Sequence, residues 1–145
     1  AFNEAIKYSN KIAMSLSDKF CVDRHKKNFL DLVKNKLDIT FANEQEILEL
    51  IDATSFNDVI SFGKKINKTL VITRSDKGSV VINQNEVVEC KSHKNLKIVD
   101  LTGAGDLFAA GFLHGYINKM TLQENLNKGT EMASKVIQKI GARLD

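Results

Sequence analysis

The segment 100–108 carries the residues of this chain whose types and spacing are best suited to bind an anion. It reads Asp-Leu-Thr-Gly-Ala-Gly-Asp-Leu-Phe and lies between an apolar stretch at 97–99 and a long apolar run that starts at Phe108. This pattern predicts a strand, a turn of small residues and then a helix. The first backbone N–H groups of a helix have no partner inside it, and the helix dipole is positive there. The small residues at 103–105 therefore predict a site for an anion such as a phosphate.

Asp106 lies in the same predicted turn and has two interpretations. As an acid in the first turn of a helix, it would stabilise the helix dipole by about 0.3–1 kcal/mol. As a general base beside a bound phosphoryl group, it would take the proton of an attacking hydroxyl. Spacing alone leaves both interpretations open.

Two other polar segments follow predicted strands. Asn43 comes directly after the strand expected at 37–42, and with Glu46 three residues later it forms the pattern of a helix capping box. The segment 73–78 reads Thr-Arg-Ser-Asp-Lys-Gly and comes after a compact apolar strand. Taken alone, it is a polar turn in which Gly78 supplies a permissive backbone angle.

Composition limits the function classes. The 43% of apolar residues fits a globular domain, and a net charge of +3 dispersed over 145 residues does not indicate nucleic-acid binding. No apolar run reaches the roughly 20 residues that span a bilayer. Two groups of residues lack the spacing of a metal site, a disulfide scaffold or a catalytic triad: Cys21 and Cys90, and His25, His93 and His114. We therefore expect a cytoplasmic protein with reduced thiols, which binds neither nucleic acid nor a membrane. The chain opens without Met inside a helical pattern, so we expect a piece of a longer protein.

The expected elements alternate between helices and strands, which favours an α/β fold with a parallel sheet and an inserted antiparallel hairpin. Apolar spacing predicts helices at 2–16, from 23 to about 36, from 43, from 55 or 57, after 103, and from about 122 to 140. Strands are expected at 37–42, 70–73, 79–82, 86–89 and 97–99, and the stretch 18–22 is expected to be irregular or a short strand.

The segment 100–108 resembles the second signature of the PfkB, or ribokinase-like, carbohydrate and nucleoside kinases, usually Asp-Thr-x-Gly-Ala-Gly-Asp-x-Phe. Leu101, where the family often has Thr, is the clear departure. The residues Ser15–Asp18 and Phe20–His25 are similar to the bacterial adenosine- or nucleoside-kinase-like branch. The resemblance implies a Rossmann-like, three-layer α/β/α fold with a mostly parallel sheet plus a β-hairpin. It covers residues 1–145 as the C-terminal, ATP-binding and catalytic part of a ribokinase-like domain, without the N-terminal substrate and lid part.

The resemblance also implies roles for the polar segments. Asp106 would be the general base, and the residues of the anion hole would be Gly103, Ala104 and Gly105. Asn43 and Glu46 would hold the magnesium–phosphate end of the nucleotide, mostly through water, while still capping their helix. The residues implied to bind the nucleotide are Thr73, Ser75, Gly78, Thr130 and Gly141.

Three assignments that the resemblance implies have open alternatives. Ser75 stands where the family frequently has Gly, and its side chain would either crowd a phosphate or donate to it. Thr130 and Gly141 would line the adenine pocket or serve helix packing. Asp100 and Thr102 match the positions that supply ligands to a monovalent cation such as K⁺ in some relatives, or Asp100 hydrogen-bonds the turn.

The implied function is transfer of the γ-phosphoryl group of ATP, with Mg²⁺, to a hydroxyl of a sugar or nucleoside. The family also allows a homodimer formed through the missing lid, and we expect the 145-residue chain alone to be inactive. One alternative is a non-catalytic nucleotide-binding lobe or inactive fragment of such a kinase. Another is an α/β domain whose glycines serve packing alone. A P-loop kinase is excluded, because the sequence has no Gly-x-x-x-x-Gly-Lys-Ser/Thr.

Overall fold

Five strands form one mixed sheet in the order β1-β2-β3-β4-β5. The strands are β1 (Ala13–Ser15), β2 (Ile39–Asn43), β3 (Thr69–Thr73), β4 (Ser79–Asn83) and β5 (Glu86–Cys90). Strands β1 and β2 are parallel, with Met14 opposite Thr40. Strands β4 and β5 are joined by the two residues 84–85, so they form an antiparallel hairpin, as the sequence predicted.

The computed structural model describes residues 2–144, which group into two compact units. The first unit comprises Ala1–Ile72 and Ile82–Val87, and the second comprises Thr73–Val81 and Val88–Asp145. Strands β3, β4 and β5 contribute residues to both units. With helices between most strands, the α/β fold class is confirmed.

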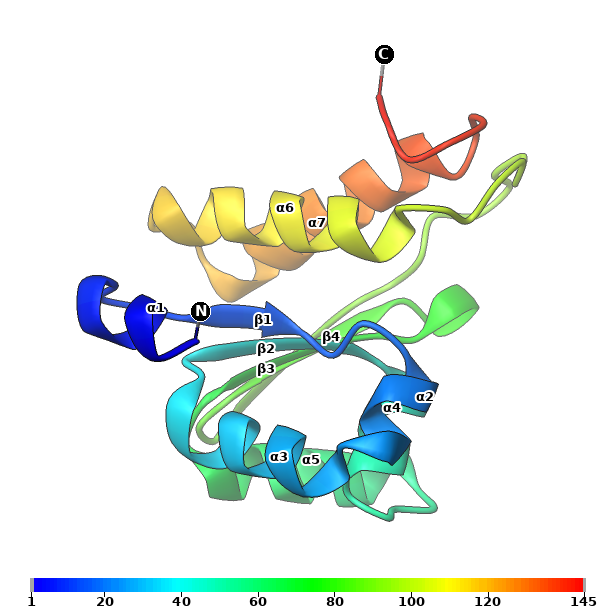
Figure 1. Ribbon diagram of the computed structural model, residues 1–145. Coiled ribbons are helices and arrows are strands. Elements are labelled where there is room, and N and C mark those ends of the chain that lie inside the picture. Colours follow the sequence, from blue (N-terminus) through cyan, green and yellow to red (C-terminus); the bar gives the residue numbers. More distant parts are fainter. Residues whose placement is uncertain (1, 145) are drawn as a thin grey trace. The chain divides into compact units, whose positions relative to one another are not determined.

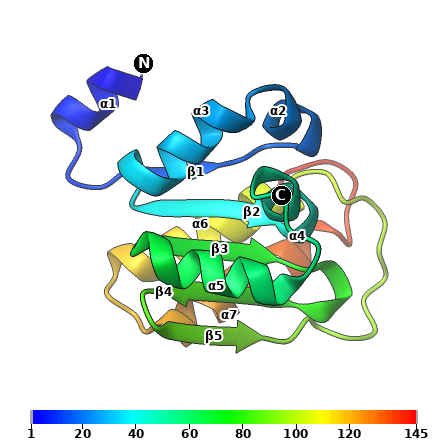
Figure 2. The ribbon, with the colours of Figure 1, turned by 90° about the horizontal axis from the view of Figure 1, so that it is seen from below.

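The first unit holds α1 (Phe2–Tyr8), α2 (Lys19–Arg24), α3 (Lys26–Asp31), a π-helical turn η1 (Leu32–Lys36), α4 (Glu44–Leu50) and α5 (Phe56–Ile66). Helices α3 and α5 cover one face of the strands of this unit (Figures 1 and 2). Its core consists of fully buried aliphatic side chains, among them Leu16, Val33, Ile47, Leu50, Val59, Leu70 and Ile72. Burial of such side chains stabilises the fold of this unit, because it removes apolar surface from water.

The second unit is built on a pair of long helices, α6 (Ala104–Ile117) and α7 (Leu122–Val136), with a single 3₁₀ turn η2 (Ser75–Lys77). The two helices lie side by side in both ribbon views. Glycines allow this close approach: a Cβ on Gly111 would lie 2.6 Å from the carbonyl oxygen of Lys128. A Cβ on Gly129 would lie 2.8 Å from the carbonyl oxygen of Phe108.

Near the N-terminus, three predicted boundaries are wrong. The helix expected at 2–16 ends at Tyr8, and residues 13–15 form β1, because their backbone pairs with β2. Residues 19–22 belong to α2, and Asp18 is its N-cap, which accepts a hydrogen bond from the Cys21 N–H (2.9 Å). The helix expected from residue 23 starts instead at Lys26 as α3.

The strand predicted at 97–99 is also wrong. No described residue between β5 and α6 belongs to a strand, and Ile98 is 62% exposed. The N–H groups of Val99 and Asp100 donate instead to the carbonyl oxygen of Ile137, just after α7 (2.8 and 3.2 Å). The backbone before the predicted anion site is therefore tied to a helix end and not to a neighbouring strand.

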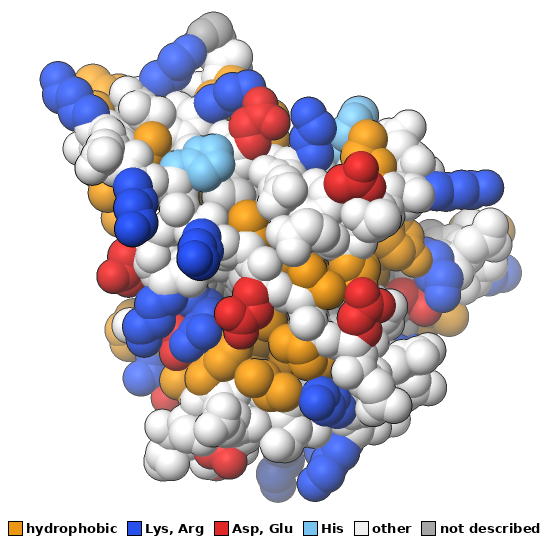
Figure 3. Space-filling model, turned by 180° about the vertical axis from the view of Figure 1, so that it is seen from behind, with side chains coloured by type: hydrophobic (Ala, Val, Ile, Leu, Met, Phe, Trp, Pro, Cys, Tyr) orange, Lys and Arg blue, Asp and Glu red, His pale blue; other side chains and the backbone are white. Residues whose placement is uncertain are grey.

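Charged side chains of both signs are interspersed on the face shown in Figure 3, in keeping with the small net charge. Within residues 2–144, none of the helices has the length and apolar character needed to cross a membrane.

Candidate active site

The start of α6 presents two free backbone donors. Gly103 is the N-cap residue, with φ +77°, and the Ala104 N–H donates to the Leu101 carbonyl oxygen (3.2 Å). Among the described residues, the N–H groups of Gly105 and Asp106 have no hydrogen-bond acceptor, as the geometry of a helix start requires. Of the residues expected in the anion hole, Ala104 has its amide engaged within the turn, whereas the amide of Gly105 is available, together with that of Asp106.

The surface over these two donors is open. A Cβ placed on Gly105 would meet no heavy atom within 4 Å, and both Gly105 and Asp106 are exposed. The Asp106 carboxylate sits in the first turn of α6, next to these free amides. An anion could therefore approach the backbone closely, with a carboxylate beside it and the positive end of the α6 dipole behind it.

The turn before α6 is braced by the segment after α7. A Cβ on Gly103 would lie 2.6 Å from the Cβ of Ala142, so only glycine fits there. Asp100 links the same two segments, because its Oδ1 accepts from the N–H (2.9 Å) and hydroxyl (2.7 Å) of Thr102 while its Oδ2 accepts from the Gly141 N–H (2.9 Å). The hydrogen bonds from Thr102 lower the pKa of Asp100 most, and the hydrogen bond from Gly141 lowers it further.

Residues 73–78 form the turn from β3 into β4. The Arg74 N–H donates to the Gly78 carbonyl oxygen (2.7 Å), and the Gly78 N–H donates to the Ser75 carbonyl oxygen (3.1 Å). Gly78 has φ +93°, and a Cβ there would overlap the carbonyl oxygen of Cys90. Ser75 is exposed and also left-handed, with φ +52°, a conformation that glycine adopts most easily. Serine thus occupies a backbone conformation here that suits glycine.

Thr130 lies inside the second unit and not on an open surface. It is 7% exposed, and its hydroxyl lies 3.5 Å from both Ser79 Oγ and Cys90 Sγ. A contact between Thr130 and an adenine stays a prediction. Cys90, which the sequence did not point to, is partly exposed beside this residue.

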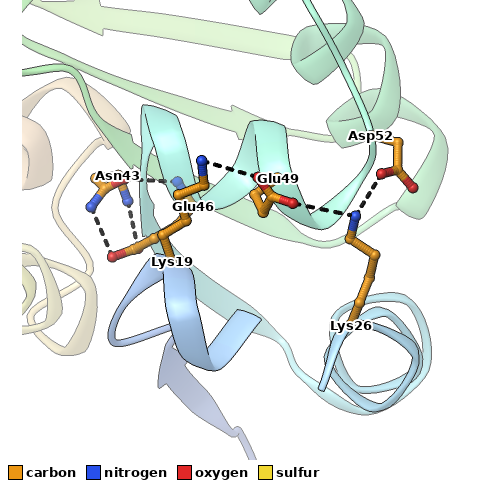
Figure 4. A network of polar contacts seen from close by, with 6 residues as sticks. All are labelled: Lys19, Lys26, Asn43, Glu46, Glu49 and Asp52. Carbon is orange, nitrogen blue, oxygen red and sulfur yellow. Dashed lines mark hydrogen bonds and ion pairs between the residues drawn. The ribbon is translucent and has the colours of Figure 1, made fainter. Parts of the chain in front are cut away.

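Asn43 and Glu46 belong to the first unit and form the predicted capping box at the start of α4 (Figure 4). The Glu46 N–H donates to Asn43 Oδ1 (2.8 Å), and the Glu46 carboxylate accepts from the N–H (2.9 Å) and Nδ2 (2.8 Å) of Asn43. Glu46 is only 5% exposed. Burial raises the pKa of Glu46, and the Asn43 N–H partly offsets this.

The far end of α4 is held by lysines from α2 and α3. Glu49 accepts from Lys19 (3.2 Å) and Lys26 (3.6 Å), and Lys26 also contacts Asp52 (Figure 4). Pairs that are this exposed contribute little to stability individually, at most about 1 kcal/mol each. Their arrangement nevertheless ties two short helices, α2 and α3, to α4, the helix at whose start Asn43 and Glu46 lie.

The predicted site residues thus fall into two sets. Asp100, Thr102, the turn 103–106 and Gly141 lie together in the second unit, which also holds Thr73, Ser75, Gly78 and Thr130. Asn43 and Glu46 form a separate pair in the first unit. Residues 2–144 contain no cluster of three or more His, Cys, Asp or Glu side chains that could hold a metal ion.

Comparisons with known proteins place this chain in a family. Residues 1–145 match the pfkB family carbohydrate kinases. The cytidine kinase of Thermococcus kodakarensis is 34% identical over 121 residues, which cover 80% of this chain and 42% of that protein. The adenosine kinase from Sinorhizobium meliloti is 38% identical with a TM-score of 0.94, over 99% of this chain and 45% of that structure.

A probable sugar kinase from Rhizobium etli is also 38% identical, with a TM-score of 0.91 over 98% of this chain and 43% of that structure. The chain therefore spans less than half the length of these relatives. The match over its whole length shows that the chain belongs to the pfkB family of carbohydrate kinases.

Proposed function

We propose that this chain is the ATP-binding and catalytic part of a kinase that transfers a γ-phosphoryl group to a hydroxyl of a sugar or nucleoside. The observation that carries the proposal is the pair of free amides of Gly105 and Asp106 at the open start of α6. Free N–H donors aimed at a transferring phosphoryl group provide the electrostatic stabilisation on which such reactions depend.

In this proposal Asp106 is the general base. Its carboxylate is exposed in the first turn of α6, so a substrate hydroxyl can reach it without rearrangement of the core. Removal of the hydroxyl proton by a positioned carboxylate contributes about 10²–10⁴-fold to such a reaction. Gly103 shapes the turn, and Ala104 begins the helix that presents the donors.

ATP would be held by residues from several segments. Those of the second unit are Thr73, Ser75, Gly78, Thr130 and Gly141. Asn43 and Glu46 offer amide and carboxylate oxygens, the donor type that Mg²⁺ prefers, and both Glu46 oxygens already accept hydrogen bonds from Asn43. This arrangement favours contact with a hydrated ion through water. When bound, Mg²⁺ would neutralise charge on the phosphates.

The acceptor class is narrowed by two observations. The residues at 15–18 and 20–25 resemble the adenosine-kinase-like branch, and relatives named adenosine kinase and cytidine kinase match most of this chain. We therefore place nucleosides before sugars among the acceptors to be tested.

The direct test is an assay of the full-length protein with ATP, Mg²⁺ and a panel of nucleosides and sugars, alongside Asp106→Asn. We expect phosphorylation of at least one acceptor, and a loss of about 10²–10⁴-fold in kcat for the variant. Equal rates for the variant and the parent would remove Asp106 as the base. ATP binding without transfer to any acceptor would favour the alternative of a non-catalytic nucleotide-binding lobe.

A further inference from the structure

Asp100 joins two segments that are 41 positions apart in the chain. One carboxylate oxygen accepts from the N–H and hydroxyl of Thr102, in the turn before α6. The other accepts from the Gly141 N–H, in the segment after α7. The contact of Gly103 with Ala142 lies beside this bridge, so the donor-bearing start of α6 is fixed against the end of the chain at two points.

Asp100 and Thr102 are also the residues that the resemblance implies as ligands of a monovalent cation. A hard cation needs converging oxygen lone pairs. Here three donors direct their hydrogens at the Asp100 carboxylate, which has about four acceptor sites, so the carboxylate retains only about one lone pair for a cation. The donors supply the positive charge density that a cation would otherwise supply, and a bound cation would have to displace or compete with them. The residues present therefore do not fit a monovalent cation well.

We propose that this hydrogen-bonded bridge replaces a monovalent cation, and that Asp100 is a positioning residue which holds the start of α6 in place without K⁺. The inference rests on the proposed function only in so far as the positioned amides act in phosphoryl transfer. Charge-assisted hydrogen bonds of this kind are stronger than neutral ones, and three of them on one carboxylate form a stable link.

The first test measures ion dependence. The full-length protein is studied in KCl or NaCl against choline chloride at constant ionic strength, by thermal unfolding and by kinase assay. We expect the melting temperature to change by less than about 1 °C and the activity by less than about twofold between these salts. A K⁺-specific rise of several degrees, or an activation of about tenfold or more, would overturn the proposal.

The second test measures the bridge itself by hydrogen exchange of the Gly141 amide. We expect slow exchange in the parent and exchange at least about tenfold faster in Asp100→Asn, because the variant presents an amide donor to N–H groups that need an acceptor. Equal exchange in the two proteins would show that the bridge does not exist in solution.

A matched pair of variants covers the case in which Asp100→Asn does not fold. Thr102→Val removes one donor at nearly constant shape, and Thr102→Ser retains the hydroxyl. We expect Thr102→Val to increase the exchange of Gly141 and the KM for ATP by a few-fold, and Thr102→Ser to restore both. No rescue by Thr102→Ser would contradict the proposed role of the hydroxyl.

These readouts separate the inference from the proposed function. If no acceptor is phosphorylated in any salt, the proposed function fails, whereas the unfolding and exchange measurements still decide whether the bridge stands in for a cation. If transfer occurs and depends on K⁺, the inference fails and the function stands.

Discussion

Ser75, in the turn after β3, stands where the family frequently has glycine. Its φ of +52° lies in the left-handed region, which L-residues adopt at a cost of about 1–2 kcal/mol. The side chain is exposed, so no packing offsets this cost. The turn therefore has a backbone conformation that suits glycine, although serine occupies the position.

We predict that Ser75→Gly raises the free energy of unfolding by about 0.5–1 kcal/mol. Relief of the left-handed strain exceeds the entropy that glycine adds to the unfolded chain. Urea unfolding measures the change. Asp76→Gly is the control, since Asp76 is not left-handed, and it should be neutral or destabilising. A Ser75→Gly variant less stable than the parent would contradict the assigned backbone geometry.

Glu46 combines burial with ionisation, which makes stability depend on pH. Its pKa in the folded state is raised above the ordinary 4.5, chiefly because the carboxyl is buried. The folded protein therefore keeps the proton to a higher pH than the unfolded chain does. The contribution of Glu46 to stability is fully present below the ordinary pKa and is lost as pH rises through the raised pKa.

We predict that the stability of the parent relative to Glu46→Gln falls as the pH rises above the ordinary pKa of 4.5 and through the raised pKa of the folded state. The variant has no ionisable group at this position, so its stability does not decrease as the pH rises through the pKa of Glu46. Urea unfolding of both proteins at a series of pH values measures the difference. A difference that is constant or rises with pH would show that the folded-state pKa is not raised.

At the scale of elements, the contact of α6 with α7 depends on backbone approaching backbone. Gly111 and Gly115 lie one turn apart on α6 and face Lys128, Gly129 and Asn125 of α7. The Gly-x-x-x-Gly spacing at 111–115 was visible in the sequence, but only the partner helix shows what it is for. Under the proposed function, the site at the start of α6 depends on this packing, because α6 must hold its amides in a fixed position.

We predict opposite effects from one substitution at two positions of α6. Gly111→Ala should lower the free energy of unfolding by about 1–3 kcal/mol, because the added methyl group has no room. Gly105→Ala should be neutral or should raise it by up to about 1 kcal/mol, because the methyl group meets open space and alanine favours the helix. Denaturant unfolding of both variants measures this. Equal destabilisation would contradict the described packing.

Across the whole molecule, elements fixed by local signals were predictable from the sequence. Helix α5 starts directly after its N-cap Ser55, one of the two starts that the sequence predicted, and the hairpin of β4 and β5 needed only alternation and a short turn. The Asn43–Glu46 capping box and the helix after Gly103 were predicted in the same way.

Features fixed by distant partners were not predictable. Residues 13–15 have the apolar spacing of a helix, but pairing with β2 makes them a strand. Val99 has the character of a strand residue, but its N–H donates to Ile137, 38 positions away. No local signal indicated the hydrogen bond from Gly141 to Asp100, which completes the brace of the site. In each case a tertiary hydrogen bond outweighed local propensity.

We predict that the 145-residue chain alone is inactive as a kinase. It spans less than half of relatives that act as kinases, so we expect the 145-residue chain alone to show no ATP-dependent phosphorylation of any sugar or nucleoside. The full-length protein, assayed in parallel, is the positive control. Turnover by the short chain above the background of its Asp106→Asn variant would contradict this expectation.

The most direct measurement of the central claim is the kcat of Gly105→Ala in the full-length protein, with its stability measured on the same sample. The claim is that the free amides at the start of α6 stabilise the transferring phosphoryl group. The account predicts a kcat lower by about 10²-fold or more in a protein at least as stable as the parent, because the methyl group occupies the space of the anion. A variant with the kcat of the parent would contradict it.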